Sequence, residues 1–305
     1  MDTQELINKK EQAALMLRLG LGAVFLIGGV SKLSLLLNSA THDAMVNSYM
    51  GTTGYINSLF QQYLFTGNMG ELITPSLFLT SLSTFELLSG IALIAGFMVR
   101  PLALIYAFLL WSFVVSLPVM TVPGVEIDVK TYTSPAIFVQ IRDIALSGLM
   151  FTLFNLGAGS KSIDSRLIAP QDAVNWNNLG LLLRLSMGIL FVVSGFFGEF
   201  SKVPNFATWQ PLMAILGVVL IFGSDKFVRA AGAVIITIMV WYIFHKLSAD
   251  KGVIANLNSF KREFALGAAG GVLLLLGGGA LFTARDLLTR GQSYLNSIFK
   301  RAKLA

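Results

Sequence analysis

Cysteine is absent from this chain of 305 residues, and histidine is nearly so. Without thiols the chain forms no disulfide, no thiolate metal site, no Cys-x-x-Cys redox pair and no covalent haem attachment. The two histidines, His42 and His245, have no metal-ligand partner at helical spacing. We therefore expect no metal, haem or flavin centre within this chain.

Charge is also scarce, because Asp, Glu, Lys and Arg make up only 12% of the residues. Soluble domains carry about 25% charged residues, so about half of the usual charge is missing. Hydrophobic residues make up 55% of the chain, and the mean hydropathy is +0.73. Eight apolar runs reach or approach the ~20 residues with which a helix crosses a bilayer. These runs cover residues 14–36, 76–99, 102–120, 136–157, 178–198, 207–224, 227–246 and 264–284. The composition predicts an all-α membrane protein with eight transmembrane helices.

The apolar runs form two similar sets of four, and three short sequences recur in the same order at offsets of 166, 127 and 120 residues. The matching segments are Leu17–Gly29 with Leu183–Gly195, Gly90–Gly96 with Gly217–Gly223, and Arg142–Leu146 with Arg262–Leu266. Because four spans are an even number, both halves enter the membrane from the same side. The pattern predicts two parallel-repeat four-helix bundles, related by a pseudo-twofold axis along the membrane normal.

The two halves differ in the length of their loops, which indicates that they have different roles. The predicted parts are a first unit at 1–159, a cytoplasmic linker at 160–177, a second and degenerate unit at 178–284, and a basic amphipathic tail at 285–305. The first unit has the larger outer loops, at residues 37–75 and 121–135, where the second unit has a short connection at 199–206 and the stretch 247–261. Elaborated loops usually carry the functional residues. We therefore expect the site in the first half, with the second half retained mainly for packing.

The placement of basic residues predicts the orientation in the membrane. Fourteen of the 22 Lys and Arg residues fall on the side that holds both termini, which places the termini in the cytoplasm by the positive-inside rule. Arg18 and Arg184 are interpreted as anchors on that side. The basic excess thus reflects topology, and no nucleic-acid partner is expected. The tail, with Leu, Ile and Phe among basic residues, predicts a helix lying on anionic lipid; a solvated basic tail is the alternative.

Glu86 is the most informative single residue. It lies 11 residues after Pro75 and 14 before Arg100, so it falls near the middle of its span. Ionisable groups at that depth cost several kcal/mol and usually mark function. The structural alternative is an ion pair or hydrogen bond with an arginine of a neighbouring span. The second half has Met213 at the matching position, so a site would belong to the first half.

Arg142 and Asp143 form a second intramembrane group, because only 13 residues separate Asp143 from Gly157 and the fourth span must begin before Arg142. Lys32, at the outer end of the first span, can reach the same level. We expect these three residues and Glu86 to line one outward-facing cavity. Two cations suit a small anion or a polar head group. The alternative is that the basic side chains extend to the interface, as long cationic side chains often do.

These residues resemble the DoxX/DoxD superfamily of four-helix membrane proteins. The resemblance rests on Leu17-Arg18, Gly22, Phe25, Gly29 and Lys32 in the first span; on Glu86, Gly90, Leu93, Gly96, Arg100 and Ala103 across the next two; and on Arg142-Asp143, Ala145 and Gly148 in the fourth. It is good over residues 14–157 and weak over 178–284, which implies a tandem fusion of two units. The second half lacks the span-two Glu and has Gly198 where Lys32 would repeat.

The DoxD type is the small subunit of thiosulfate:quinone oxidoreductase and acts with a DoxA partner; other members are membrane partners of oxidoreductases. The resemblance implies an inner-membrane subunit, bacterial or archaeal, of a quinone-linked oxidoreductase, with thiosulfate as a candidate substrate. Lys32 and Arg142 would bind the substrate anion, while Glu86 or Asp143 would handle quinone protons as catalytic residues. Lipid and other membrane or periplasmic redox subunits are the expected partners, since no DoxA-like segment is fused to the chain. A non-catalytic structural subunit and a small-molecule transporter remain the alternatives.

Overall fold

The computed structural model describes residues 3–51, 54–66, 70, 72–117, 130–131, 134–167, 174–197 and 209–302, and these are mainly helical. The helices are α1 (Thr3–Leu36), α2 (His42–Met50), α3 (Ser58–Phe65), α5 (Pro75–Ala95), α6 (Val99–Ser116), α8 (Ala136–Leu156), α9 (Asp164–Leu167), α10 (Trp176–Phe197), α11 (Gln210–Phe222), α12 (Asp225–Lys246), α13 (Val253–Leu276) and α14 (Ala284–Ala302). Two short strands, β1 (Lys130–Thr131) and β2 (Ser134–Pro135), pair in antiparallel orientation. The predicted all-α membrane fold is confirmed.

Six of the described helices are long and apolar enough to cross a membrane, namely α1, α5, α6, α8, α10 and α12. The other two expected spans fall short for different reasons. The apolar helix α11 has only 13 residues, fewer than the ~20 that cross a bilayer. Helix α13 has 24 residues, but Lys261, Arg262 and Glu263 interrupt its apolar sequence. The predicted number of eight spans is therefore not confirmed.

Glycine determines where two of the predicted spans end. The second span was expected to continue to residue 99, but α5 ends at Ala95 because Gly96 adopts a left-handed conformation with φ of 75°. The eighth span was expected over 264–284, whereas α13 begins at Val253 and ends at Leu276. Gly277 and Gly279 have φ of 72° and 71°, which glycine adopts without the steric cost of a side chain. Glycines 277–279 thus follow the helix instead of packing within it.

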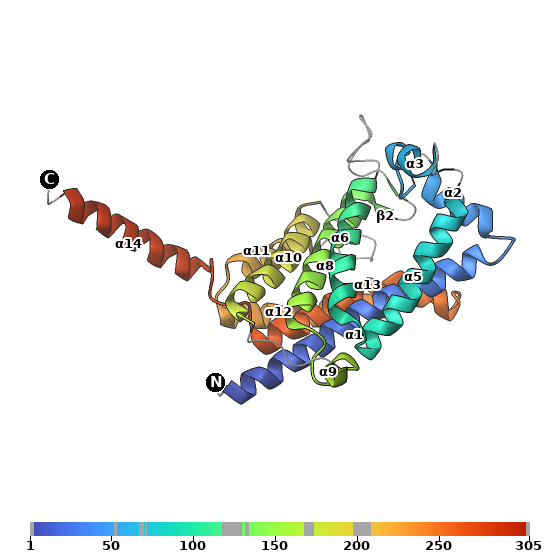
Figure 1. The fold of residues 1–305 in the computed structure, drawn as a ribbon. Helices are drawn as coiled ribbons and strands as arrows, with labels where there is room; N and C mark the ends of the chain where they lie inside the picture. Colours follow the sequence, from blue (N-terminus) through green and yellow to red (C-terminus); the bar gives the residue numbers. More distant parts are fainter. Residues whose placement is uncertain are drawn as a thin grey trace.

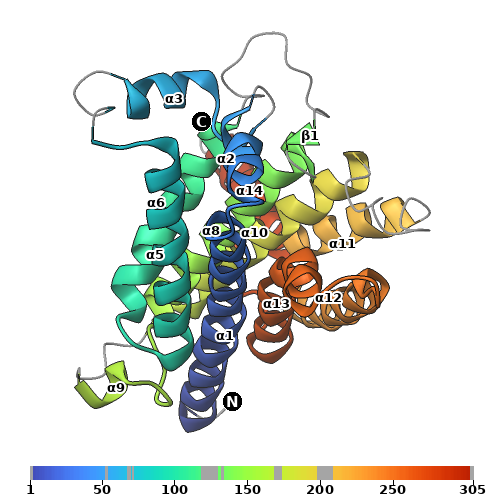
Figure 2. The same ribbon diagram turned by 90° about the vertical axis from the view of Figure 1, so that its right-hand side faces the viewer.

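Helices of the two halves are interleaved. Helix α1 packs between α5 of its own half and α13 of the other half, as Figure 2 shows. Helix α8 packs between α6 of its own half and α10 of the other half. The pairings inside each half correspond as well, since α1 with α5 matches α10 with α11, and α6 with α8 matches α12 with α13. The core therefore depends on contacts across the halves, and packing is not confined to four-helix units.

Small residues permit the close helix contacts, and these contacts recur at the offsets of the sequence repeat. A Cβ added to Gly22 would lie 2.7 Å from Ile94 Cγ1, and a Cβ added to Gly188 would lie 2.6 Å from Ile221 Cγ1. Between the halves, Gly20 of α1 faces Ala268 of α13. The corresponding contact joins Ser186 of α10 and Gly148 of α8. Such small residues allow helix backbones to approach closely in membrane proteins.

The two ends of the helix assembly carry different features. The N terminus and α9 lie at one end, and α2 and α3 lie at the opposite end (Figures 1 and 2). Lys10 donates a hydrogen bond to Val174 O at 2.7 Å, and Met16 packs against Gly271. The beginning of α1 and the last turns of α13 therefore lie at the same end. Helix α14 follows from there and extends away from the other helices (Figure 1).

Arg18 and Arg184 have a different role from the predicted surface anchors. They are only 3% and 0% exposed. Arg18 donates to Ala158 O at 2.8 Å and to Lys161 O at 2.6 Å, in the segment after α8. Arg184 donates to Ile221 O at 2.7 Å and to Leu281 O, in the segment after α13. Each buried guanidinium thus donates to carbonyls at or just after the ends of helices in its own half. These carbonyls have no partner within a helix and need another donor.

Candidate functional site

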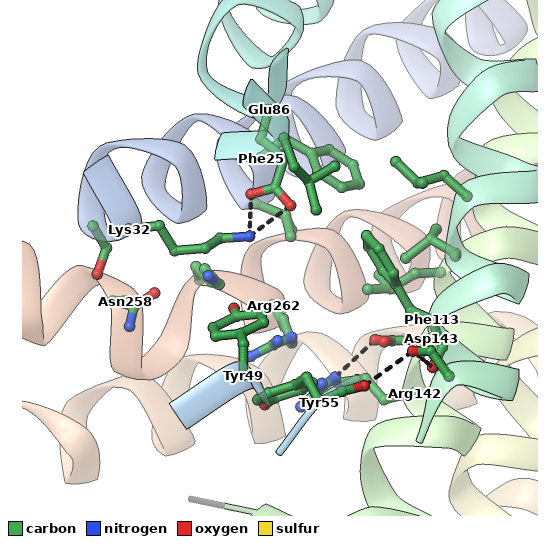
Figure 3. Close-up of a pocket in the computed structure, with 18 of the residues that line it drawn as sticks. Phe25, Lys32, Tyr49, Tyr55, Glu86, Phe113, Arg142, Asp143, Asn258 and Arg262 are labelled. Carbon is green, nitrogen blue, oxygen red and sulfur yellow. Dashed lines mark hydrogen bonds and ion pairs between the residues drawn. The ribbon is translucent and has the colours of Figure 1, made fainter. Parts of the chain in front are cut away.

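A cavity of about 590 Å³ is lined by residues of both halves, including residues of α2 and α3. All four residues that the sequence singled out line it: Lys32 from α1, Glu86 from α5, and Arg142 and Asp143 from α8. Figure 3 shows the Lys32–Glu86 pair on one side of this cavity and Asp143 and Arg142 on the other. The structure therefore brings together the predicted site residues, while their roles stay predictions.

Glu86 forms an ion pair with Lys32. The Nζ of Lys32 lies 2.6 Å from Oε1 and 2.5 Å from Oε2 of Glu86, so both carboxylate oxygens accept from one ammonium. The pair is well enclosed, with side-chain exposures of 15% for Lys32 and 5% for Glu86. Sequence reasoning considered an arginine as the structural partner of Glu86, and the partner is this lysine instead. A carboxylate enclosed with its counter-ion suits both charge balance and proton handling.

Arg142 and Asp143 lie on the first turns of α8 and are 3% and 6% exposed. Arg142 Nε lies 3.3 Å from Asp143 Oδ1, and its guanidinium lies 5.4 Å from the centre of the Phe138 ring. Its Nη2 is buried and has no hydrogen-bond partner among the described residues. Arg142 therefore does not extend to the membrane surface. It presents a free donor inside the cavity.

The first outer loop contributes to the wall of the cavity through α2 and the segment before α3. Tyr49 and Tyr55 stack with ring centres 5.0 Å apart, and the Lys32 ammonium lies 6.0 Å from the centre of the Tyr49 ring. Burial raises the pKa of Tyr49 to about 12, although Lys32 opposes the shift, so the phenol stays protonated at neutral pH. Asn57 holds the segment in place, since its amide donates to Ser116 O at 2.6 Å at the end of α6. This part of the expected elaborated loop does belong to the site.

The second half supplies charges that sequence reasoning did not assign to the site. Lys246 of α12 and Lys261, Arg262 and Glu263 of α13 all line the cavity. Lys261 approaches α1 closely, because a Cβ added to Gly28 would lie 2.9 Å from Lys261 Nζ and 3.4 Å from Glu86 Oε2. The expectation that the second half serves mainly for packing was therefore too narrow: its residues form part of the cavity wall.

A signal for these residues was present in the repeat. Arg262 and Glu263 are the counterparts of Arg142 and Asp143 at the offset of 120 residues. Residues close to a twofold axis meet their own counterparts, so equivalent pairs on α8 and α13 can share one site. The cavity contains both pairs. No repeat signal exists for Lys32 and Glu86, whose counterparts are Gly198 and Met213.

Within the described part of the chain, no group of three or more His, Asp or Glu side chains is placed to hold a metal ion. Residues 118–129, 132–133 and 198–208, which include most of the second outer loop, lie outside that part. The expected lack of a metal, haem or flavin centre remains a prediction. The chemical groups that the described cavity offers are amines, guanidiniums, carboxylates, phenols and aromatic rings.

In comparison with known protein families, residues 13–117 match the DoxX family. This DoxX domain covers 105 of the 305 residues and includes α1 from residue 13 onward and all of α2, α3, α5 and α6. Lys32 and Glu86 lie inside it, whereas Arg142, Asp143 and all cavity residues of α12 and α13 lie outside it. No curated protein and no solved structure matches the chain.

With this domain and six apolar helices, the chain is a multi-pass membrane protein. The DoxX match supports the predicted resemblance over residues 13–117 and stops short of the fourth predicted span, which carries Arg142 and Asp143. It does not extend to the second half, to a thiosulfate:quinone oxidoreductase, or to a particular membrane.

Proposed function

We propose that this chain is the membrane subunit of a quinone-linked oxidoreductase and that the quinone binds in the cavity between the two halves. The observation that carries the proposal is the placement of an enclosed Lys32–Glu86 pair beside aromatic walls within a helical membrane protein. A volume of about 590 Å³ falls within the range of ~300–1,000 Å³ that is typical of ligand pockets. Phe25, Phe60 and Phe113 line it and offer surfaces for an apolar ring.

In this proposal the carboxylates move protons and the basic residues hold polar oxygens. Reduction of a quinone to a quinol takes up two electrons and two protons. Glu86, within the membrane domain, and Asp143, on the opposite wall, are the catalytic residues that deliver those protons. Lys32 donates to Glu86 in the resting state and becomes available to a quinone oxygen when Glu86 is protonated, because a neutral carboxyl binds an ammonium less strongly.

Thiosulfate is the candidate electron donor that the DoxD resemblance suggests. Two thiosulfate anions form one new S–S bond to give tetrathionate and release the two electrons that the quinone accepts. Arg142 and Lys32 were the predicted anion-binding residues, and of the two it is Arg142 that retains a free donor. Other membrane or periplasmic redox subunits would complete the electron path. Both termini would face the cytoplasm of a bacterial or archaeal inner membrane, with the α2–α3 end on the outer side.

Saturable quinone binding tests the proposal. A short-chain benzoquinone analogue should raise the unfolding temperature of the purified chain in neutral detergent. Phe113→Ala should weaken this binding by about tenfold, because stacking on an aromatic ring contributes roughly 0.5–1.5 kcal/mol beyond the buried area. Phe108→Ala is the matched control, since Phe108 lies on the same helix but is 61% exposed and does not line the cavity. Binding that does not saturate, or that both variants leave unchanged, would refute the quinone site.

We also propose that the chain is a tandem duplication of a four-helix unit. The support is the recurrence of close contacts at the repeat offsets, as with Gly22 and Ile94 against Gly188 and Ile221. The same order of pairings holds within and between the halves. Divergence has left the Lys32 and Glu86 positions of the second copy without charge. One asymmetric cavity therefore replaces two equivalent ones.

Lipid is the partner that we propose for α14. Thr283 and Asp286 cap its beginning, with Asp286 N donating to Thr283 Oγ1 at 3.2 Å and Phe282 N donating to Asp286 Oδ2 at 2.9 Å. The hydrogen bond from Arg290, followed by that from Phe282 N, lowers the pKa of Asp286. Leu287, Leu288 and Tyr294 are 41%, 68% and 69% exposed and share one stripe of the helix. An apolar stripe with basic residues on the remaining surface suits an anionic lipid interface.

The absence of cysteine allows a direct test of this contact with lipid. Leu288→Cys, labelled with an environment-sensitive fluorophore and reconstituted in vesicles with anionic lipid, should show a blue-shifted emission. Ser293→Cys, on the opposite face by helical spacing, is the matched control and should keep the emission of a probe in water. The shift should shrink in zwitterionic vesicles or at high salt. Equal spectra at the two positions would instead indicate a solvated tail.

A further inference from the structure

Three consecutive charged residues of α13 enter the cavity at a change in helix direction. Phe260, just before them, has the non-helical angles φ −131° and ψ 19°. Lys261 and Glu263 are each 8% exposed, so α13 carries these charges into the protein interior. Exposing them on an outer helix face would avoid that desolvation cost. The proposed handling of quinone protons at Glu86 and Asp143 gives Lys261 and Arg262 no role.

Among the described residues that line the cavity, the basic ones outnumber the carboxylates. The five basic side chains are Lys32, Arg142, Lys246, Lys261 and Arg262, and the three carboxylates are Glu86, Asp143 and Glu263. Glu86 is engaged by Lys32 and Asp143 by Arg142. Throughout the described residues, neither Lys261 nor Arg262 has an acidic oxygen within 4 Å. Two cations of α13 therefore lack a direct counter-ion in the described structure.

Two buried polar atoms that border the cavity lack hydrogen bonds. They are Nη2 of Arg142 and Oδ1 of Asn258, both without a partner among the described residues. Buried polar atoms are nearly always hydrogen-bonded in native proteins, so each exception needs an explanation. A guanidinium is a donor only, and what Arg142 lacks is therefore an acceptor. Asn258 lies one turn before Arg262 on α13, and its amide can accept from a hydroxyl or, with the group turned, donate.

We propose that the cavity binds an anionic oxygen group between α8 and α13 through Arg142 and Arg262, with Lys261 adding positive charge from the side of the Lys32–Glu86 pair. The three side chains come from both halves, and Figure 3 shows Arg262 pointing into the cavity near Tyr49. Guanidinium groups bind carboxylate and phosphate oxygens through two parallel hydrogen bonds, and the lysine adds a point charge. The same chemistry is offered by the head group of an anionic lipid and by a free inorganic oxyanion.

This inference concerns the same cavity as the proposed quinone site but does not need a quinone. It moves the anion-binding role from Lys32, which Glu86 engages, to Arg262, the repeat counterpart of Arg142, and to the neighbouring Lys261. Asp143 and Glu263 face the same space and favour ligands that also carry a hydroxyl or a second polar group. The apolar wall formed by Leu82, Leu109 and Phe78 suits the chain of a lipid, whereas a free oxyanion would leave that wall to the quinone.

Two probes distinguish the sources of the anion. The full chain, purified in neutral detergent, is titrated with sodium thiosulfate and, separately, with phosphatidylglycerol. Its unfolding temperature is followed with sodium chloride at matched ionic strength as the background. We expect one of the probes to raise the unfolding temperature saturably. Saturation by thiosulfate assigns a free oxyanion, and saturation by phosphatidylglycerol but not by phosphatidylcholine assigns a lipid head group.

Three variants locate the binding. Arg262→Gln and Lys261→Gln should each weaken the effective probe by about tenfold, the change that accompanies 1.4 kcal/mol. The affinity of Arg262→Lys for the probe should lie between those of wild type and Arg262→Gln. Lysine keeps the positive charge but cannot form the two parallel hydrogen bonds of a guanidinium. Lys251→Gln, an exposed change just before α13, should bind as wild type does. The unfolding temperature without probe shows whether each variant is folded. If the glutamine variants are not folded, the affinity of Arg262→Lys for the probe tests the proposal in their place.

The proposal is overturned if neither probe saturates, or if the α13 variants bind as tightly as Lys251→Gln. Its failure is distinct from failure of the quinone proposal. A chain that binds the benzoquinone analogue but neither anion refutes only the anion site. A chain that binds an anion but no quinone refutes only the quinone site.

Discussion

Glu86→Gln is expected to lower quinone-dependent turnover of the complex by about 10²–10⁴-fold, the usual contribution of a general acid or base. The same change should also destabilise the protein, for a separate reason. Both oxygens of Glu86 accept from Lys32, and a glutamine offers one acceptor and turns an NH₂ donor toward the ammonium. Leaving a buried cation without its partner costs about 3–5 kcal/mol. Activity and stability therefore have to be measured separately.

A double-mutant cycle separates the two effects. Lys32→Met removes the cation, so Glu86→Gln combined with Lys32→Met should regain most of the unfolding temperature that Glu86→Gln loses. Coupling of roughly 0.5–3 kcal/mol is usual for residues in direct contact. If Glu86 handles protons, turnover in the double variant stays below that of Lys32→Met alone, which has lost the same contact to the quinone, despite the recovered stability of the double variant. If turnover returns together with stability, Glu86 serves only as a counter-ion and the catalytic assignment is wrong.

The measurement uses the protein purified with its native partners, since the chain alone supplies no assigned electron donor. Turnover with a soluble quinone analogue is followed optically, and the unfolding temperature is recorded on the same preparations. Glu11→Gln is the matched control, because Glu11 lies on α1 at the opposite end and hydrogen-bonds Ser160 outside the cavity. Loss of turnover in this control would point to a general effect of removing a carboxylate.

Much of the fold can be predicted from the sequence because hydropathy and helix length are local properties. The runs at 136–157 and 227–246 agree closely with α8 and α12. The run at 264–284 fails because Lys261, Arg262 and Glu263 lower the local hydropathy and make the beginning of α13 resemble a loop. In the structure these three charged residues line the cavity, and Lys261 also contacts α1 at Gly28. Their environment is therefore formed by residues that are distant in the sequence. No window of neighbouring residues contains that information.

Part of the site could be predicted because charged residues are rare within apolar membrane spans. Glu86 and the Arg142–Asp143 pair stand out within apolar runs, and the structure places them around one cavity with Lys32. The α13 residues were missed although their likeness to Arg142–Asp143 was visible, because the two halves were treated as separate bundles. Once α1 packs on α13 and α8 on α10, charges from both halves meet. The interleaving of the halves is a property of packing that the repeat alone does not reveal.

The second large effect is expected at Arg184, which is fully buried. Arg184→Leu should reduce the yield of folded protein and lower its unfolding temperature by several degrees or more. The carbonyls of Ile221 and Leu281 would both lose their donor, and a buried polar group left unsatisfied costs about 1–3 kcal/mol. The unfolding temperature of Arg184→Lys should lie between those of wild type and Arg184→Leu. An ammonium can donate to one carbonyl, but it lacks the planar guanidinium with which Arg184 reaches two chain ends.

Arg166→Leu distinguishes this internal role from the anchoring role that the sequence suggested. Arg166 is exposed on α9, at the end where the N terminus lies. Both substitutions remove one positive charge from the same side of the membrane and introduce the same side chain. If Arg184 acts only through the positive-inside rule, the two variants should behave alike in yield and unfolding temperature. If it joins the ends of α11 and α13 from within, Arg184→Leu is destabilised and Arg166→Leu is not. Arg18→Leu, which leaves Ala158 O and Lys161 O without their donor, should then show the same loss of stability in the first half.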